Sequence, residues 1–383
     1  MKKIIVSKTA QTAYPIVPRC ADKIHFSSGD LIMIRIHSDF TGGNIRVKSI
    51  EGDTVYLENE LRDSTIDWFY FAFCVEGAEG REIKFVMQKN RLGYFGPAVS
   101  HDGREWHWLG ACDGDSFTYK FDSDEHRVYF AHSMLYHPDR FDDLCKRLDL
   151  QVDELCKSRK ARSVPCLKFG EGEISIILTS RHHACESTGN LVLEGVITEL
   201  VRDPINGATV FAVPFVDYDG VLDGDQGKSR DPHDHNRDYT DSPIYPEVRA
   251  IREYTDEHGC NFGFDFHSPW HRGGINDKIF VVRNMEEKLA EFDRFSTALE
   301  SEITPDSMQY SINNDFPPNT SWNQPSTSFG CTMNSRPECH LAFTLESAYF
   351  GTNDDPVSAD KLIELGKCFA RAIKKYAASV GIS

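Results

Sequence analysis

From residue 137 to the carboxyl end, short apolar runs alternate with amphipathic helical patterns, and this alternation constrains the fold most strongly. Strands are expected at 173–178, 209–216, 262–266, 278–282 and 341–345. Helices are expected at 137–148, 191–201, 242–258, 285–303 and 359–378, with Ser242 as the N-cap of the third. The pattern predicts an α/β fold: a mixed, mostly parallel sheet with helices on both faces.

The first third of the chain has a different residue pattern, in which short β segments are separated by glycine-containing turn signals. The expected strands are 24–26, 31–37, 45–50, 54–58, 68–74, 83–88, 106–109, 117–121 and 128–131. Many short strands at this spacing predict an antiparallel β-sandwich. We therefore expect two domains, a β-sandwich at residues 1–131 and an α/β domain at residues 132–383.

The composition suits two folded domains and argues against some partners. The 383 residues include 25 Phe, 14 Tyr and 5 Trp, which supply ample core material. A formal net charge of −17 argues against nucleic-acid or anionic-membrane binding, because both need positive charge. No stretch reaches the ~18 apolar residues of a membrane span, and the apolar run after Lys3 is too short for a secretory signal. Eleven irregularly spaced cysteines without a C-x-x-C pair favour reduced thiols, so we expect a cytoplasmic protein.

Polar and metal-competent side chains follow four of the expected strands. They are His182, His183 and Glu186 after 173–178, Asp234, Asn236 and Arg237 in the region after 209–216, His267 after 262–266, and Glu346 after 341–345. Binding sites in α/β sheets gather where strands end at their carboxyl side, so we expect these side chains to lie together.

These residue types suit a catalytic zinc ion, which takes imidazole nitrogen and carboxylate oxygen and keeps one position for water. His183 and Glu186 are three residues apart, so one helical turn would place both on one side. His267 would complete a set of two histidines and one carboxylate. Glu346 would then be free to act as a base toward the water. On composition alone, His182 is an alternative ligand.

The order of the motifs along the chain is distinctive. It runs His183-x-x-Glu186, Val213–Val221 containing Asp219-Gly220, Asp234-x-Asn236-Arg237, His267-Ser268 and Thr344-Leu345-Glu346. This order resembles that of the zinc carboxypeptidase family, closest to its cytosolic carboxypeptidase branch. The amino-terminal stretches 68–71, 93–100, 106–110 and 128–131 resemble the β-sandwich that precedes the catalytic domain in that branch.

The resemblance implies one Zn²⁺ per chain, bound by His183, Glu186 and His267, with Glu346 as the general base. It also implies that Asn236 and Arg237 bind the terminal carboxylate of the substrate, a role that suits the forked guanidinium. These assignments remain implications of the family likeness at this point.

Two further roles follow from the resemblance. Asp234 would accept the other ring N–H of His183 and fix its orientation. The family stabilises the oxyanion of the reaction with an arginine in the loop before Asp234. Arg230 is the first candidate for this role in the sequence, and Lys228 is the second.

Some positions depart from the family pattern. Ala184-Cys185 stands where the branch usually has Pro-Gly, and Asp217-Tyr218 stands where the family has Asn-Pro. We expect Cys185 to pack rather than to bind metal. We expect His233, His235 and His271 to be polar lining of the site rather than ligands of a second metal.

The expected function is that of a zinc metallocarboxypeptidase, a protease that hydrolyses the C-terminal amide bond of a peptide or protein tail. Removal of acidic residues would match the cytosolic branch, although the acidic loop 217–225 suits basic or small residues better. One alternative is an amidohydrolase that deacylates a small N-acyl amino acid, against which the sandwich domain argues. Another is a non-catalytic binding protein that keeps the fold, against which the intact ligand set and Glu346 argue.

Overall fold

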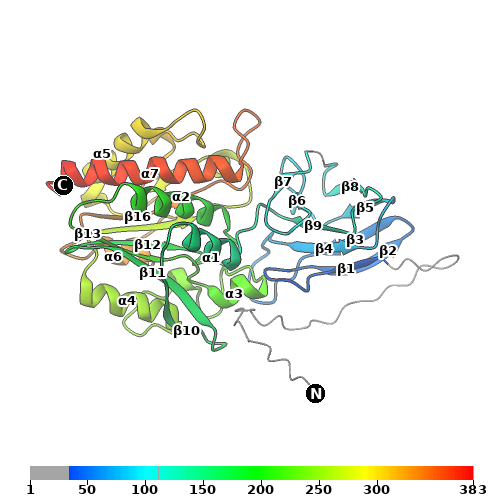
Figure 1. Ribbon diagram of the computed structural model, residues 1–383, viewed down its shortest axis with the longest axis horizontal. Helices are drawn as coiled ribbons and strands as arrows, with labels where there is room; N and C mark the ends of the chain where they lie inside the picture. Colours follow the sequence, from blue (N-terminus) through cyan, green and yellow to red (C-terminus); the bar gives the residue numbers. More distant parts are fainter. Residues whose placement is uncertain (1–33, 111, 383) are drawn as a thin grey trace, which may run out of the picture.

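The computed structural model describes residues 34–110 and 112–382 and arranges them in two lobes (Figure 1). The amino-terminal lobe holds a five-stranded sheet in the order β1-β4-β9-β6-β7 and a four-stranded sheet in the order β2-β3-β5-β8. The strands are β1 (Arg35–His37), β2 (Arg46–Glu51), β3 (Thr54–Glu58), β4 (Ala72–Glu76), β5 (Glu82–Val86), β6 (Ala98–Ser100), β7 (His107–Trp108), β8 (Ser116–Lys120) and β9 (Arg127–Ala131). The strand expected at 24–26 and the start of the one expected at 31–37 lie outside the described residues.

The two amino-terminal sheets share one apolar cluster. Leu57 of β3 and Phe85 of β5 join Phe73 of β4 and Phe130 of β9 in it, and the rings of Phe73 and Phe130 stack at 5.2 Å. The five-stranded sheet is antiparallel throughout. In the other sheet, β3 and β5 pair in parallel, which contradicts a fully antiparallel arrangement. The chain crosses into the five-stranded sheet as β4 between them, so β5 returns in the direction of β3.

The apolar stretch at 68–71 is not a strand, and β4 begins only at Ala72. Trp68, Phe69 and Tyr70 instead pack in a cluster that includes Cys185 of the other lobe. Their apolar character therefore reflects contact between the lobes rather than a sheet face.

The carboxyl-terminal lobe is built on a seven-stranded mixed sheet in the order β10-β11-β13-β12-β14-β16-β15. Its strands are β10 (Val152–Lys157), β11 (Ser163–Gly170), β12 (Ile174–Ser180), β13 (Ala208–Val213), β14 (Phe262–His267), β15 (Phe280–Val282) and β16 (Leu341–Glu346). The central strands β13, β12, β14 and β16 are parallel, and the pairings toward both edges are antiparallel. The predicted mixed α/β sheet is confirmed.

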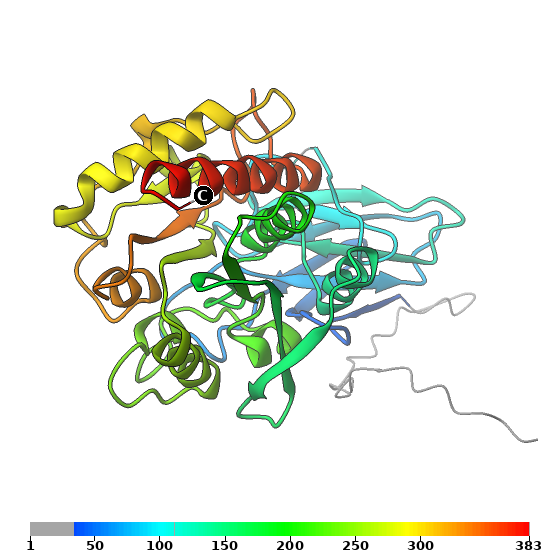
Figure 2. The same cartoon turned by 60° about the vertical axis from the view of Figure 1, so that its left-hand side comes forward.

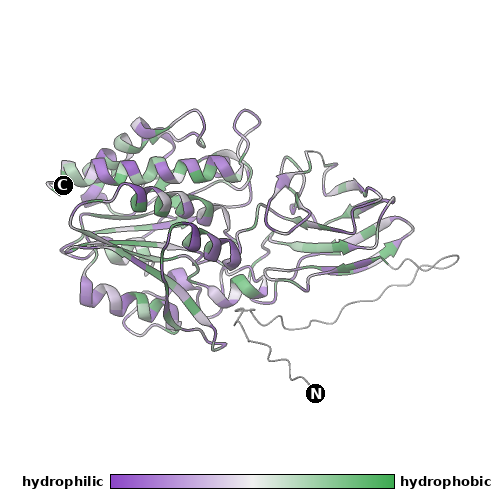
Figure 3. Ribbon diagram, in the orientation of Figure 1, coloured by the Kyte–Doolittle hydropathy of each residue, from purple (hydrophilic) through white to green (hydrophobic). Residues whose placement is uncertain are grey.

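Helices cover both faces of this sheet (Figures 1 and 2). One face packs on α1 (Pro138–Arg147), α2 (Thr188–Arg202), α5 (Leu289–Glu302) and α7 (Ala359–Ser379), and the other packs on α4 (Pro246–His258) and α6 (Phe329–Asn334). Leu178 belongs to the first cluster and its neighbour Ile177 to the second, because successive strand residues face opposite sides. Apolar colour accordingly follows the strands and the inner helix sides in Figure 3.

Shorter helical segments lie in the connections. They are α3 (Tyr218–Asp223), η1 (His235–Arg237), η2 (Gly274–Asp277), η3 (Glu286–Lys288) and η4 (Ile312–Asn314). Helix α4 begins four residues after the N-cap expected at Ser242, and Tyr245 is its N-cap residue. The Asp238 carboxylate accepts the N–H groups of Ile244 and Tyr245 at 2.9 and 2.8 Å, which holds this stretch as a turn.

Two further findings concern the described residues alone. None of their helices combines the length and the apolar character that a membrane crossing requires. Every cysteine among them is free.

Candidate active site

The ends of β14 and β16 bring His267 and Glu346 side by side, as register partners of the parallel pair. The phenylalanines of β14 belong to the cluster on one face of the sheet. Asp265 and His267 alternate with them and therefore face the other side. The same alternation in β16 places Thr344 and Glu346 on that side.

A tight turn after β12 positions His183 and Glu186. Arg181 adopts the left-handed backbone conformation with φ of 61°, which is uncommon for a side chain of its size. Its buried guanidinium donates to the carbonyl oxygens of Ala184 at 2.7 Å and of Tyr136 at 3.2 Å, which stabilises the turn. The Glu186 N–H donates to the His183 carbonyl at 3.2 Å, so a turn rather than a helix brings the two side chains together.

His183, Glu186 and His267 form a compact, buried set of donor atoms. Nδ1 of His183 lies 2.8 Å from Glu186 Oε1, Nδ1 of His267 lies 2.6 Å from Glu186 Oε2, and the two Nδ1 atoms are 3.1 Å apart. Ligands placed tetrahedrally at zinc distances are separated by roughly 3.3 Å. Two imidazole nitrogens and one carboxylate with this spacing fit a zinc ion.

The second ring nitrogen of each histidine faces a carboxylate. Nε2 of His267 lies 2.6 Å from Asp265 Oδ2, and Nε2 of His183 lies 3.7 Å from Asp234 Oδ1. At His267 the Asp265 carboxylate keeps the proton on Nε2 and leaves Nδ1 as a lone-pair donor toward a cation. Asp234 lies near Nε2 of His183 but beyond hydrogen-bond distance, so the role that the resemblance implied for it stays a prediction. Asp265 was not identified from the sequence as the partner of His267. Its position two residues before that histidine on the same strand could have indicated it, because such residues share one face of the sheet.

The charges in the site influence one another strongly. Burial alone would raise the pKa of Glu186, but His183, Lys228 and His267 hold it well below its usual value. Burial raises the pKa of Glu346 to about 7. Burial lowers the pKa of Lys228, yet the carboxylates of Glu186 and Glu346 outweigh this and raise it, so the ammonium stays charged. Glu346 is therefore the carboxyl group suited to gain and lose a proton near neutral pH.

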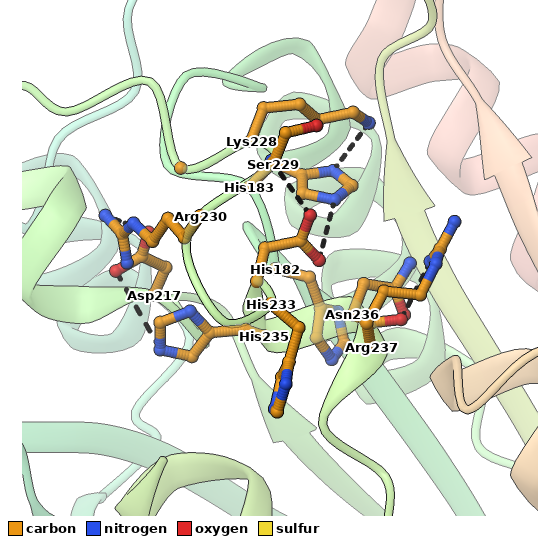
Figure 4. Close-up of polar contacts among 12 residues, drawn as sticks. His182, His183, Asp217, Lys228, Ser229, Arg230, His233, His235, Asn236 and Arg237 are labelled. Atoms are coloured by element: carbon orange, nitrogen blue, oxygen red, sulfur yellow. Dashed lines mark hydrogen bonds and ion pairs between the residues drawn. The ribbon is translucent and has the colours of Figure 1, made fainter. Parts of the chain in front are cut away.

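The structure separates the two candidates for oxyanion stabilisation. The ammonium of Lys228 lies 3.1 Å from Nδ1 of His183. The guanidinium of Arg230 points away from that histidine, 3.1 Å from Asp63 and 2.9 Å from Asp217 (Figure 4). Arg230, the first candidate, is thus away from the donor set, whereas Lys228 lies beside it. One of the carboxylates that hold Arg230, that of Asp63, comes from the other lobe and lies far from it in sequence, so no local pattern could show its orientation.

Residues of the amino-terminal lobe hold the loop that carries Lys228. Gln226 forms two 3.0 Å hydrogen bonds with the backbone of Tyr70, accepting from its N–H and donating to its carbonyl. The Gly227 N–H donates to Asp63 at 2.7 Å. Gly227 has φ of 73°, and a β-carbon there would lie 2.0 Å from a backbone nitrogen of the turn after β12. Glycine therefore permits the close approach that places Lys228 beside the donor set.

One cleft joins these groups. Its lining comprises His183, Lys228, Asn236, Arg237, His267, Val282, Asn284, Trp322, Asn323, Gln324, Ser326, Ser328, Cys331, Thr344 and Glu346. The side-chain oxygen of Asn236 accepts the Phe329 N–H at 3.0 Å, and its nitrogen lies 3.4 Å from Nε2 of His267. Arg237 is more exposed, beside Asn236 (Figure 4).

His182 faces away from this donor set. Its Nδ1 lies 2.8 Å from Asp265 and its Nε2 lies 2.8 Å from the Tyr239 hydroxyl. His182, Asp265 and His267 also lie close enough to hold a cation. However, both ring nitrogens of His182 already have partners, and His182 is not among the described residues that line the cleft. The set with His183 therefore fits a catalytic metal better, since substrate must reach it.

The three other histidines expected as polar lining are absent from the described lining of the cleft, so that prediction is wrong. His233 lies 2.7 Å from Asp238, His235 stacks on Tyr245 at 3.7 Å between ring centres, and His271 lies 3.0 Å from His132. Each turns toward a partner away from the cleft. Burial raises the pKa of Cys185 to about 12, so this fully buried thiol packs rather than ionises.

Comparison with known proteins links these features to a family. Residues 36–132 match the family described as the cytosolic carboxypeptidase N-terminal domain. Cytosolic carboxypeptidase 2 of Xenopus tropicalis is 25% identical over 187 residues, which are 42% of this chain and 18% of that protein. The amino-terminal lobe thus carries the match to a carboxypeptidase family, and the chain is similar to cytosolic carboxypeptidases.

Other similarities extend over more of the chain. An uncharacterised protein of Zymomonas mobilis is 28% identical over 257 residues, 61% of this chain and 67% of that protein. A metallo-carboxypeptidase from Pseudomonas aeruginosa, solved with (2-guanidinoethylmercapto)succinic acid, is 21% identical and shares the fold with a TM-score of 0.75. The match covers 90% of this chain and 99% of that one.

Proposed function

We propose that this protein is a zinc metallocarboxypeptidase that hydrolyses the C-terminal amide bond of a peptide or protein tail. One observation carries the proposal: the two histidines of a donor set completed by a buried carboxylate line one cleft with Glu346 and Arg237. Zinc held by His183, Glu186 and His267 would polarise the amide carbonyl and acidify a water molecule.

Glu346 is the proposed general base. Its Oε2 is buried without a hydrogen-bond partner among the described residues, so a water molecule or substrate group can meet it there. Burial raises the pKa of this carboxyl to about 7, which suits a group that takes a proton from water and later gives it to the leaving amine.

Arg237 and Asn236 are proposed to bind the terminal carboxylate. A guanidinium fork can pair with both carboxylate oxygens at once. Because the oxygen of Asn236 is committed to the Phe329 N–H, its amide nitrogen remains to donate to an anion. The pair would select substrates that end in a free carboxylate at this point of the cleft.

We propose Lys228, rather than Arg230, as the group that stabilises the oxyanion. We expect Lys228→Met to lower kcat by about 10²–10³-fold, because a positioned donor to the developing charge is lost. Arg230→Gln should instead lower the melting temperature, since breaking a buried ion pair costs about 3–5 kcal/mol. Steady-state kinetics and thermal denaturation of both variants test this. A folded Arg230→Gln protein with the larger loss of kcat would contradict the assignment.

The proposed function is tested with peptides that have free or amidated C-termini, beside N-acyl amino acids. We expect release of the last residue from the free peptides only, since the Arg237 pair needs a carboxylate. A zinc chelator should stop the reaction, and added zinc should restore it. Deacylation of the N-acyl amino acids without peptide cleavage would favour a small-molecule amidohydrolase. Peptide binding without turnover would favour a non-catalytic role.

Two broader proposals accompany this function. We propose domains at residues 1–131 and 132–383, supported by separate apolar clusters in the two lobes and by the family match at 36–132. We propose a cytoplasmic location, supported by the likeness to cytosolic carboxypeptidases.

A further inference from the structure

Apart from the residues of the proposed catalytic site, the described residues that line the cleft have no charged side chains. The charged side chains of the lining are Lys228, Arg237 and Glu346, and each already has a role in the proposed function. The remaining wall consists of Val282, Asn284, Trp322, Asn323, Gln324, Ser326, Ser328, Cys331 and Thr344. The side chain of a bound terminal residue would therefore meet only neutral groups.

The arrangement of this wall places its small residues near the reacting centre. Thr344 lies on the same strand face as Glu346, two residues before it. Cys331 comes from α6, and its sulfur lies 3.9 Å from the Ser326 hydroxyl. Val282 adds an apolar side chain from β15.

The amide groups of this wall are largely committed to the protein itself. Asn284 donates to the Ala342 carbonyl at 3.1 Å and accepts from Asn334 at 2.9 Å. The Asn323 amide nitrogen donates to the Arg283 carbonyl at 2.7 Å. These side chains consequently form a fixed neutral surface rather than a set of donors for an acidic group.

A second cavity of about 390 Å³ shares Asn284, Ser326 and Cys331 with the cleft. These three side chains therefore line both spaces. Glu286 and Glu287 line the second cavity, but both are exposed. Exposed carboxylates attract a cation only weakly and repel an anion, so they do not create a site for a charged side chain.

We propose that the terminal residue released by this protein has an uncharged side chain, and that Cys331 and Ser326 set this preference. The inference rests on the proposed carboxypeptidase function. A charged side chain would have to leave water for a neutral wall without a partner of opposite charge. This proposal differs from the removal of acidic residues that the likeness to the cytosolic branch suggested.

The exposed edge of the cleft is consistent with an uncharged residue of moderate size. Trp322 stacks on Phe316 with parallel rings 4.8 Å apart, and it remains 51% exposed at the cleft. A fixed aromatic face of this kind favours contact with aliphatic or amide side chains.

The test uses the full-length zinc-loaded protein and peptides identical except for the last residue, which is Leu, Gln, Ala, Glu or Lys. We expect kcat/KM for the best uncharged residue to exceed that for Glu and Lys by about 100-fold. A peptide ending in Glu or Lys as the best substrate would overturn this inference and leave the proposed function intact. Cleavage of none of the peptides would overturn both.

A gain-of-function variant tests the two named residues. Cys331→Arg should raise kcat/KM for the Glu-ended peptide at least ~10-fold, because it supplies the missing opposite charge. Cys331→Ser, which adds no charge, should keep the original ranking. Ser326→Arg provides a second position if Cys331→Arg lowers the melting temperature. No gain toward the Glu-ended peptide in either folded arginine variant would overturn the assignment of Cys331 and Ser326.

Discussion

Replacing Glu346 with glutamine is expected to abolish turnover while the metal stays bound. Glutamine keeps the size of the side chain at the end of β16, but it cannot accept a proton from water. Loss of such a group lowers kcat by about 10²–10⁴-fold. Steady-state kinetics with a free-carboxyl peptide, together with the zinc content from elemental analysis, measure both parts of the prediction.

A matched control comes from the segment just before the same strand. Glu338 is partly exposed and is not among the described residues that line the cleft, so Glu338→Gln should retain turnover. Full activity of Glu346→Gln would remove Glu346 from its proposed role. Loss of zinc together with activity would instead assign Glu346 to metal binding.

Removal of either histidine of the donor set is expected to release the metal. The wild-type protein should carry about one zinc per chain, and His183→Ala and His267→Ala should carry almost none after dialysis. Each substitution removes one of three protein ligands and leaves the carboxylate at its outer nitrogen without its partner. Zinc content per folded chain is the measurement.

Two further variants serve as controls for the zinc measurement. Asp265→Asn should weaken zinc binding by only about 10–100-fold, because Asp265 acts through His267. His258→Ala, on the exposed end of α4, should leave zinc content unchanged. Retention of zinc by both His183→Ala and His267→Ala would refute the ligand assignment.

The sequence predicted the central sheet well, because the apolar residues of β12, β14 and β16 form continuous or alternating runs. It also predicted which polar groups would meet, since parallel strands end at one edge of a sheet. It missed β10, whose mostly exposed residues give no apolar signal, β11, whose apolar run is interrupted by Pro165, and α6, which has only six residues. Elements of this kind depend on their surroundings rather than on local pattern.

The errors within the site have the same origin. The orientation of Arg230 is set by Asp63, which is more than a hundred residues away in the chain. His235 turns toward Tyr245 because η1 points successive side chains in different directions. The turn at Arg181 depends on carbonyl groups that only the fold assembles. The order of residues along the chain could indicate a family resemblance, but it could not indicate the directions in which these side chains point.

The bonds from Tyr70 and Asp63 to Gln226 and Gly227 bear on whether the two lobes are separable modules. A fragment starting at residue 132 would keep every proposed zinc ligand but lose the supports of the Lys228 loop. Such a fragment would bind metal and still be a poor catalyst. The amino-terminal lobe is thus better regarded as part of the proposed catalytic site than as an accessory unit, because the segment between β3 and β4 holds the Lys228 loop.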